Sequence, residues 1–151
     1  MRVYLDANCF NRPFDDQSQD RVRRESEAVL RILQRVLRGE DELVWSSALT
    51  LELSAHPEPE IREQLVSWAG RSREFASTVA PVRERADELA GQGLTPIDAV
   101  HVAFAEAARC DLFLTCDDAL TRRAKRLGLS VRVVSPIEYV LEVTDAGAVD
   151  R

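Results

Sequence analysis

Short apolar runs alternate with amphipathic segments along almost the whole chain, and this alternation most constrains the fold. Five runs have the composition of strands, the third weaker than the others: residues 3–5, 43–45, 75–79, 112–115 and 131–134. Helical patterns lie at about residues 20–38, 48–53, 59–68, 81–90, 96–108 and 118–127, and a short one opens at 135. This order predicts an α/β fold of three layers, α/β/α, with a central, mainly parallel sheet of four to five strands.

The 151 residues fit one compact domain, and no internal repeat or linker divides them. We expect the domain to span residues 1–143. Residues 144–151 are expected to form a flexible tail, because the sequence after Val143 has the character of a frayed helix end. The polar stretch 6–19 contains Pro13 and two asparagines and is expected to be a loop.

Four acidic residues stand where predicted strands end or predicted helices begin. Asp6 ends the first apolar run, and Asp117 closes the fourth. Glu52 follows the second strand by a few residues, and Asp98 lies at the start of a later helix. Ligands of open α/β sheets bind outside the carboxyl ends of the strands, so these carboxylates can converge on one point. Such a cluster suits Mg²⁺ or Mn²⁺ and suggests metal-assisted phosphodiester chemistry.

Each of these carboxylates also has a structural explanation. Asp98 follows Thr95 at a helix start, where an acid is stabilised by the helix dipole. Asp117 fits the N-cap of the next helix, and Glu52 fits the solvent face of an apolar helix. Asp6 has few structural duties apart from capping the segment that follows it. Four together are less easily explained by capping, and if they converge, a divalent cation would relieve their repulsion.

Composition argues against several other classes of protein. There is no run of about 18 apolar residues, so a spanning helix is not expected, and the early strand leaves no room for a signal peptide. The three cysteines, Cys9, Cys110 and Cys116, lack C-x-x-C spacing, which disfavours a disulfide framework or zinc site and favours a reducing cytoplasm. The net charge of −6 disfavours a nonspecific nucleic-acid binder but not a nuclease with an acidic metal pocket.

Four stretches of the chain have residues, order and spacing that are typical of a known family. They are Val3–Asn8, Ser47–Glu52, Asp98–Ala103 and Asp111–Asp118. They resemble the PIN domain, and in particular the VapC-like toxins of bacterial type II toxin–antitoxin pairs. The last two stretches are the most specific, because their order, separation and strand–helix placement all agree. The resemblance extends from Arg2 to about Leu141.

The resemblance implies a PIN-like α/β/α domain that acts as a Mg²⁺- or Mn²⁺-dependent endoribonuclease. The catalytic residues that it implies are Asp6, Glu52, Asp98 and Asp117, and the metal ligands among them are Asp6, Asp98 and Asp117. Asn8 and Thr115 match supporting polar positions, and Asp118 is a close alternative to Asp117. His101 lies on the same helical face as Asp98 and could orient it, although a local hydrogen bond of a partly buried residue is the more ordinary role.

The resemblance also implies partners. Arg12, Arg21 and Arg24 could hold an RNA backbone, or could form a solvated helix face paired with acids such as Glu25. A small cognate VapB-like antitoxin, a homodimer and a cytoplasmic location without membrane attachment are expected. Two alternatives stay open: a housekeeping PIN nuclease without an antitoxin, and an inert PIN-like module that binds RNA or protein. The presence of all four acids argues against the inert module.

Overall fold

The computed structural model describes residues 1–76 and 79–149. Within these residues, five parallel strands form one sheet in the order β3-β2-β1-β4-β5. The strands are β1 (Arg2–Leu5), β2 (Glu42–Ser46), β3 (Glu74–Ala76), β4 (Leu112–Leu114) and β5 (Arg132–Val134). The predicted parallel sheet is confirmed. The third strand begins one residue earlier than predicted, and residues 77–78 of that prediction lie outside the described part of the chain.

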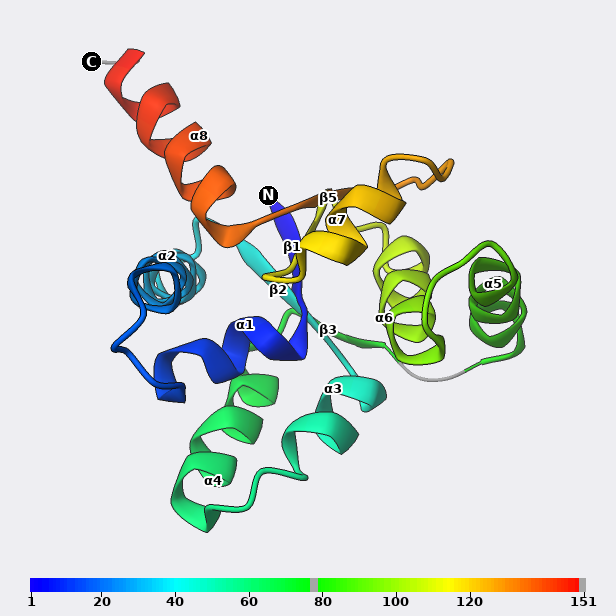
Figure 1. Ribbon diagram of the computed structural model, residues 1–151, viewed down its shortest axis with the longest axis horizontal. Coiled ribbons are helices and arrows are strands. Elements are labelled where there is room, and N and C mark those ends of the chain that lie inside the picture. Colours follow the sequence, from blue (N-terminus) through cyan, green and yellow to red (C-terminus); the bar gives the residue numbers. More distant parts are fainter. Residues whose placement is uncertain (77–78, 150–151) are drawn as a thin grey trace.

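Helices cover both faces of this sheet, as the alternating pattern predicted. They are α1 (Ala7–Asn11), α2 (Asp20–Leu37), α3 (Ser47–Leu53), α4 (Pro59–Ser67), α5 (Ala80–Gly91), α6 (Pro96–Ala107), α7 (Asp118–Ala124) and α8 (Pro136–Val149), with 3-10 turns η1 (Arg12–Phe14) and η2 (Trp68–Arg71). Figure 1 shows α2 and α8 on one side of the strands and α5 and α6 on the other. Among the described residues, no helix has both the length and the apolar character needed to cross a membrane.

The central strands are buried on both faces, which explains why they read as continuous apolar runs rather than as alternating ones. Val3, Tyr4 and Leu5 of β1 are fully buried, and so are Phe113 and Leu114 of the neighbouring β4. The rings of Tyr4 and Phe113 stack, with their centroids 5.4 Å apart and their planes inclined by 10°. This packing holds β1 firmly against β4.

Strand β1 lies where the path of the chain through the sheet reverses. From β1 the chain passes to β2 and β3 on one side, and it then crosses to β4 and β5 on the other. Leu5 of β1 pairs with Leu114 of β4, so these two strands end at the same level. In open α/β sheets a crevice forms outside the carboxyl ends of the strands at such a reversal. Asp6 directly follows β1 at this place.

The stretch 6–19 was expected to be a loop, and this expectation was wrong for residues 7–14, whereas residues 15–19 form neither helix nor strand. Residues 7–14 form α1 and the 3-10 turn η1. Helix α1 starts where Asp6 Oδ1 accepts a hydrogen bond from the Ala7 backbone N, and it buries Cys9 and Phe10 in the core. A helix of five residues is too short to be stable alone or to show a helical period, so tertiary packing must hold it.

The C-terminal helix is longer than expected. Its start agrees with the predicted cap, because Ser135 Oγ accepts a hydrogen bond of 3.1 Å from the Glu138 backbone N. However, α8 continues to Val149, so residues 144–149 are helical where a frayed helix end was expected. Neither a proline nor a glycine with positive φ interrupts the helix after its first turn. A domain boundary at residue 143 stays a prediction.

Candidate metal centre

Asp6 is held at the sheet edge where β1 and β4 end. Its side chain is almost fully buried, and its Oδ1 accepts a hydrogen bond of 2.8 Å from the Ala7 backbone N. Its Oδ2 accepts bonds from Thr115 Oγ1 (2.9 Å) and Asn8 Nδ2 (3.2 Å). Asn8 Oδ1 in turn accepts a bond of 3.1 Å from the Cys116 backbone N. The predicted supporting residues Asn8 and Thr115 therefore tie the segments after β1 and β4 together around this carboxylate.

Within the described part of the chain, the carboxylate of Asp6 has no arginine or lysine beside it to compensate its charge. None of the Arg or Lys ion pairs found among the described residues includes it. Burial raises the pKa of Asp6 to about 6, although His101 and the Thr115 hydrogen bond act in the opposite direction. The negative charges of Asp98 and Glu52 raise this pKa further. Ionising Asp6 in this site therefore costs free energy, and a bound divalent cation would lower that cost.

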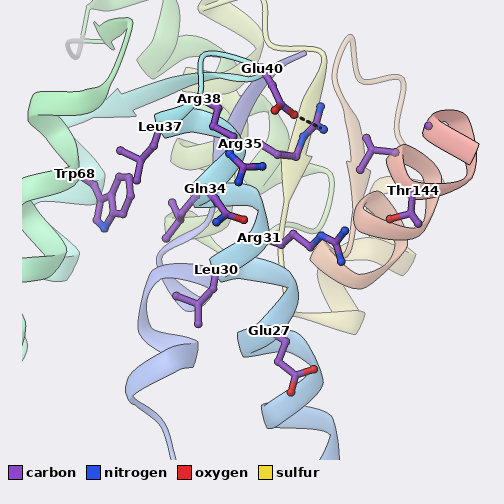
Figure 2. Close-up of a pocket in the computed structure, with 13 residues that line it drawn as sticks. Glu27, Leu30, Arg31, Gln34, Arg35, Leu37, Arg38, Glu40, Trp68 and Thr144 are labelled. Carbon is purple, nitrogen blue, oxygen red and sulfur yellow. Dashed lines mark hydrogen bonds and ion pairs between the residues drawn. The ribbon is translucent and has the colours of Figure 1, made fainter. Parts of the chain in front are cut away.

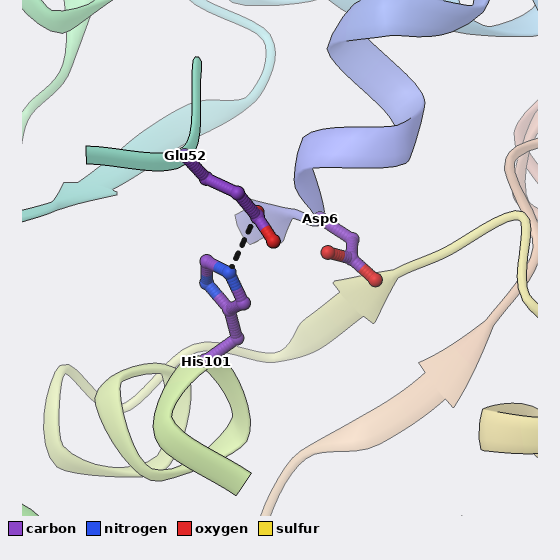
Figure 3. A group of neighbouring side chains, drawn as sticks. All are labelled: Asp6, Glu52 and His101. Carbon is purple, nitrogen blue, oxygen red and sulfur yellow. Dashed lines mark hydrogen bonds and ion pairs between the residues drawn. The ribbon is translucent and has the colours of Figure 1, made fainter. Parts of the chain in front are cut away.

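Glu52 and His101 lie beside Asp6 and complete a compact group. One possible ligand atom from each of the three side chains lies within 4.8 Å of the other two. Figure 3 shows Glu52 and His101 facing each other, with His101 Nε2 3.0 Å from Glu52 Oε2. Glu52 reaches this place because α3 follows β2 directly, with Ser46 Oγ accepting the capping bond from the Leu49 backbone N. Its carboxylate thus contacts the group instead of lying on a solvent face.

Asp98 and Asp117 stand at the starts of α6 and α7. Thr95 Oγ1 accepts a hydrogen bond of 3.2 Å from the Asp98 backbone N, as the sequence suggested. Asp117 Oδ1 accepts hydrogen bonds from two backbone N–H groups of α7, the shorter at 2.9 Å, so its capping role is confirmed. Burial raises the pKa of Asp98, against its hydrogen bond with Thr95, and the charges of Asp117 and Glu52 raise it too.

The four predicted carboxylates share one electrostatic environment but not one tight contact. Asp6 and Glu52 belong to the compact group, and the charge of Asp98 acts on Asp6. The charge of Asp117 acts in turn on Asp98. This oxygen-rich set fits a hard divalent cation such as Mg²⁺ or Mn²⁺, because the buried Asp6 forms no ion pair with an arginine or lysine among residues 1–76 and 79–149. Asp6 and Glu52 would be its nearest ligands, with Asp98 and Asp117 completing the set directly or through water.

His101 has different partners from those expected. It is fully buried, and its hydrogen bonds are neither local nor directed at Asp98. Its Nδ1 lies 2.6 Å from Tyr4 Oη, and its Nε2 contacts Glu52. Reasoning from the sequence missed Tyr4, which was read only as a strand residue. The available signal was a single hydroxyl in an otherwise aliphatic buried strand.

Asp118, the predicted alternative to Asp117, takes part in a different interaction. It is exposed and binds Arg21 through both carboxylate oxygens, with both N···O distances at 2.8 Å. Arg21 Nη2 also donates to the Cys116 backbone O at 3.2 Å. Asp118 therefore joins the start of α7 to the start of α2. The negative charge of its neighbour Asp117 instead acts on the acidic group, because it raises the pKa of Asp98.

The three arginines predicted to contact RNA all have acidic neighbours. Arg12 Nε and Arg21 Nε lie 3.3 and 3.4 Å from Oε1 of the buried Glu25. Arg24 Nε lies 3.6 Å from Asp20 Oδ2. The pairing with acids that the sequence offered as an alternative is thus present. Arg21 and Arg24 are nevertheless more than half exposed, so their guanidinium groups stay accessible to a ligand.

The shape of the surface alone would not have located this site. A groove of about 990 Å³ runs along α2 and α8, and Figure 2 shows Leu30, Leu37 and Trp68 among the side chains that line it. None of the four acids lines this groove. A smaller hollow of about 400 Å³ is lined by Glu52 and by apolar residues that include Leu51 and Ile97.

A sequence model of the PIN domain matches residues 3–126, a span that contains all four acids. The chain belongs to the PIN domain family. The family that four short stretches of the sequence suggested is therefore confirmed. A comparison of this PIN domain with curated proteins found no match.

Two solved structures resemble this PIN domain in fold. One chain of VapBC2 from Rickettsia felis, bound to a DNA fragment from its promoter, is 14% identical with a TM-score of 0.59, and the alignment covers 89% of this chain and 98% of that chain. One chain of DNA-bound VapBC from Salmonella typhimurium is 16% identical with a TM-score of 0.56, covering 90% of this chain and 98% of that one. At these identities the likeness establishes the fold.

Proposed function

We propose that this PIN domain is a metal-dependent endoribonuclease, that it is the toxin of a toxin–antitoxin pair, and that it acts in the cytoplasm. One observation carries the nuclease proposal. Asp6 is a buried carboxylate without an internal cation, held by three hydrogen bonds at the reversal point of the sheet and grouped there with Glu52. Ligands of this kind of sheet bind at that point, and an oxygen-rich group there suits Mg²⁺ or Mn²⁺.

The protein's own residues would prepare the site for hydrolysis. Asp6, Asp98 and Asp117, the ligands that the resemblance implied, are proposed to hold the metal together with the fourth catalytic acid, Glu52, which lies beside Asp6. Thr115 and Asn8 hold Asp6 in one orientation through their hydrogen bonds. What a bound divalent ion supplies in such a site is polarisation of the scissile phosphate and activation of a water molecule.

The RNA backbone is proposed to pass over the start of α2. Arg21 lies beside the segment between β4 and α7, because it bonds to the Cys116 backbone O and to Asp118. Exposed pairs of this kind contribute little to stability, so Arg21 can exchange Asp118 for a phosphate. Arg12 and Arg24 would extend the contact along the same surface.

A VapB-like antitoxin and a second copy of the chain are the proposed protein partners. The support is that the two solved chains with this fold come from VapBC complexes bound to DNA. A small gene directly upstream whose product co-purifies with the chain and suppresses its toxicity would support the antitoxin. Light scattering on the purified chain measures its oligomeric state, and a monomer at all concentrations would contradict the homodimer.

The experiment that tests the function is induced expression in a bacterial host, with growth and RNA integrity as readouts. The wild-type chain is compared with Asp6→Asn and Asp98→Asn, and Asp118→Asn is the matched control from the nearby surface. We expect growth arrest and discrete RNA fragments with the wild type and the control, and neither with the other two variants. Normal growth and intact RNA despite soluble wild-type protein would contradict the toxin and favour a housekeeping or inert PIN module.

A further inference from the structure

A chain of hydrogen bonds connects the core of the sheet to the acidic group. Tyr4 Oη, in the middle of β1, lies 2.6 Å from Ser46 Oγ and 2.6 Å from His101 Nδ1. The other ring nitrogen, Nε2, lies 3.0 Å from Glu52 Oε2. All the side chains before Glu52 are buried, so solvent does not compete for these bonds. The chain Ser46–Tyr4–His101–Glu52 therefore ends on a carboxylate of the proposed site.

Only one direction of donation satisfies every contact when the ring is neutral and Glu52 is ionised. An ionised carboxylate can only accept, so His101 Nε2–H must be the donor to Glu52. Nδ1 then has no proton and accepts from Tyr4 Oη–H, and Tyr4 accepts from Ser46 Oγ–H. Ser46 Oγ keeps a lone pair for the Leu49 backbone N, which donates to it at 3.2 Å. In this arrangement Nε2 has no lone pair with which to bind a metal.

Tyr4, which anchors this chain of hydrogen bonds, is rigidly held, whereas Glu52 at its other end is not. Tyr4 is fully buried in a central strand and stacked on Phe113. Glu52 has a partly exposed side chain on α3, a helix of only seven residues. A long acidic side chain loses rotamer freedom when it is held in one conformation, and a fixed donor lowers that loss at the moment of binding.

We propose that Tyr4 and His101 are positioning residues that orient Glu52 toward Asp6 in the metal centre. The proposal rests on the proposed nuclease function and adds to it a link between the acids and the sheet core. It gives Glu52, which the sequence could also place on a solvent-facing side of its helix, a defined place in the site. It also assigns a role to a histidine that the proposed chemistry does not use as a base.

Two substitutions of the same residue separate the two ends of the ring. In His101→Gln the side-chain amide nitrogen takes roughly the place of Nε2 and can still donate to Glu52. In His101→Asn the side-chain amide oxygen takes roughly the place of Nδ1 and can accept from Tyr4, which leaves Glu52 without its donor. Val102→Ala is the matched control, because Val102 is buried in the same helix and outside the hydrogen-bond chain.

The readouts are Mn²⁺ and Mg²⁺ affinity by calorimetry, kcat and KM on a short fluorescent RNA, and the free energy of unfolding in urea. We expect His101→Asn to weaken Mn²⁺ binding about 10- to 100-fold, as is usual for groups that support a metal ligand, and to lower kcat with KM nearly unchanged. His101→Gln should recover most of this loss. Tyr4→Phe should give a smaller loss of the same kind, and Val102→Ala should lower stability only.

Three results would overturn the proposal. The first is wild-type Mn²⁺ affinity and kcat in His101→Asn. The second is an equal loss in both His101 variants that follows lost stability, with Val102→Ala behaving alike. The third is a reversal of the preference between Mn²⁺ and Mg²⁺ in His101→Gln, which would make the imidazole itself a ligand. If the wild type binds Mn²⁺ but cleaves no RNA, the nuclease proposal fails and the Mn²⁺ affinities alone decide on the positioning role.

Discussion

The two ends of the sheet each hold a buried aspartate, and the two differ in their partners. Asp6, at the carboxyl end of β1, is 5% exposed, and Asp41, just before β2 at the opposite end, is 3% exposed. Asp41 has two cations, Arg35 Nε at 2.9 Å and the Met1 amino group at 3.3 Å, and it accepts a hydrogen bond of 2.8 Å from Tyr139 Oη. Asp6 instead accepts hydrogen bonds from neutral donors, and its pKa is raised by the nearby acids Asp98 and Glu52 and lowered by His101.

This difference separates a carboxylate whose charge is paired within the protein from one that could bind a cation. The charge of Asp41 is compensated within the protein, so Asp41 fastens α2, α8 and the N-terminus together. The charge of Asp6 is not compensated, and burial raises its pKa to about 6. Burial and residue type are the same in both, so only the partners distinguish them. The comparison predicts that an Asp→Asn substitution mainly lowers activity at Asp6 and mainly lowers stability at Asp41.

The largest expected effect is on RNA cleavage. Asp6→Asn keeps the shape of the side chain but removes a ligand charge, and the loss of several kcal/mol of metal-dependent stabilisation corresponds to a rate lower by at least about 100-fold. Asp41→Asn, the matched change at the other end, should leave the rate of the folded protein unchanged. Single-turnover cleavage of a labelled RNA measures both. Equal rates in the two variants would remove the distinction between the two ends.

The next effect is a pH dependence of stability in the metal-free protein. The pKa of Asp6 is about 6 in the folded state and has its ordinary value of 3.8 in the unfolded chain, so between these values the folded state holds a proton that the unfolded state has released. Stability from this group is therefore lost as the pH rises from about 4 to about 6, by up to about 3 kcal/mol.

Urea unfolding of the wild type and Asp6→Asn at several pH values tests this sign. The variant should become the more stable protein as the pH rises toward neutrality, and saturating Mn²⁺ should restore the wild type, because a ligand that binds only the folded state stabilises it. A wild type that gains stability relative to the variant over the same range would contradict an uncompensated Asp6. Asp41→Asn is the control for this experiment, because it removes a buried carboxylate charge without changing the metal centre.

A smaller effect on stability is expected from substitution of Asp41, at the end of the sheet opposite Asp6. Asp41→Asn removes a charge between Arg35 and the N-terminus, and we expect it to lower the free energy of unfolding by about 2 kcal/mol. This estimate is below the usual cost of breaking a buried pair, because Arg35 is partly exposed and keeps Glu40 as a partner at 2.9 Å. Denaturant titration near neutral pH measures it. Unchanged stability would show that Asp41 is not a structural anchor.

The smallest effect is expected at Asp118, which is acidic and next to the site but exposed. Its pair with Arg21 lies in solvent, and exposed pairs contribute less than about 1 kcal/mol. Asp118→Asn should therefore change stability by less than this and leave the cleavage rate near that of the wild type. Stopped-flow or gel-based cleavage assays test the second point. If Asp118→Asn lowered the cleavage rate as much as Asp6→Asn, then any acid near the strand ends would be needed for cleavage, and not specifically a buried acid without a counter-charge.

The sequence by itself determined the order along the chain of the strands and of the helices other than α1, and the acids at their ends. Thr95 before Asp98, Asp117 before α7 and Ser135 before α8 were readable because a cap depends on residues within one helical turn. The apolar runs of β1 and β4 were readable because both faces of these strands are buried. The four predicted acids therefore came from local patterns alone, and so did the family.

Only the tertiary structure decided which of these groups meet. It placed β1 between β2 and β4, which brings Thr115 to Asp6 across 109 residues. It gave His101 the partners Tyr4 and Glu52, and it turned Asp118 toward Arg21. It also stabilised α1, whose five residues show no period. The physical reason is that such contacts depend on the strand order and on packing across the sheet, and neither is recorded in the spacing of neighbouring residues.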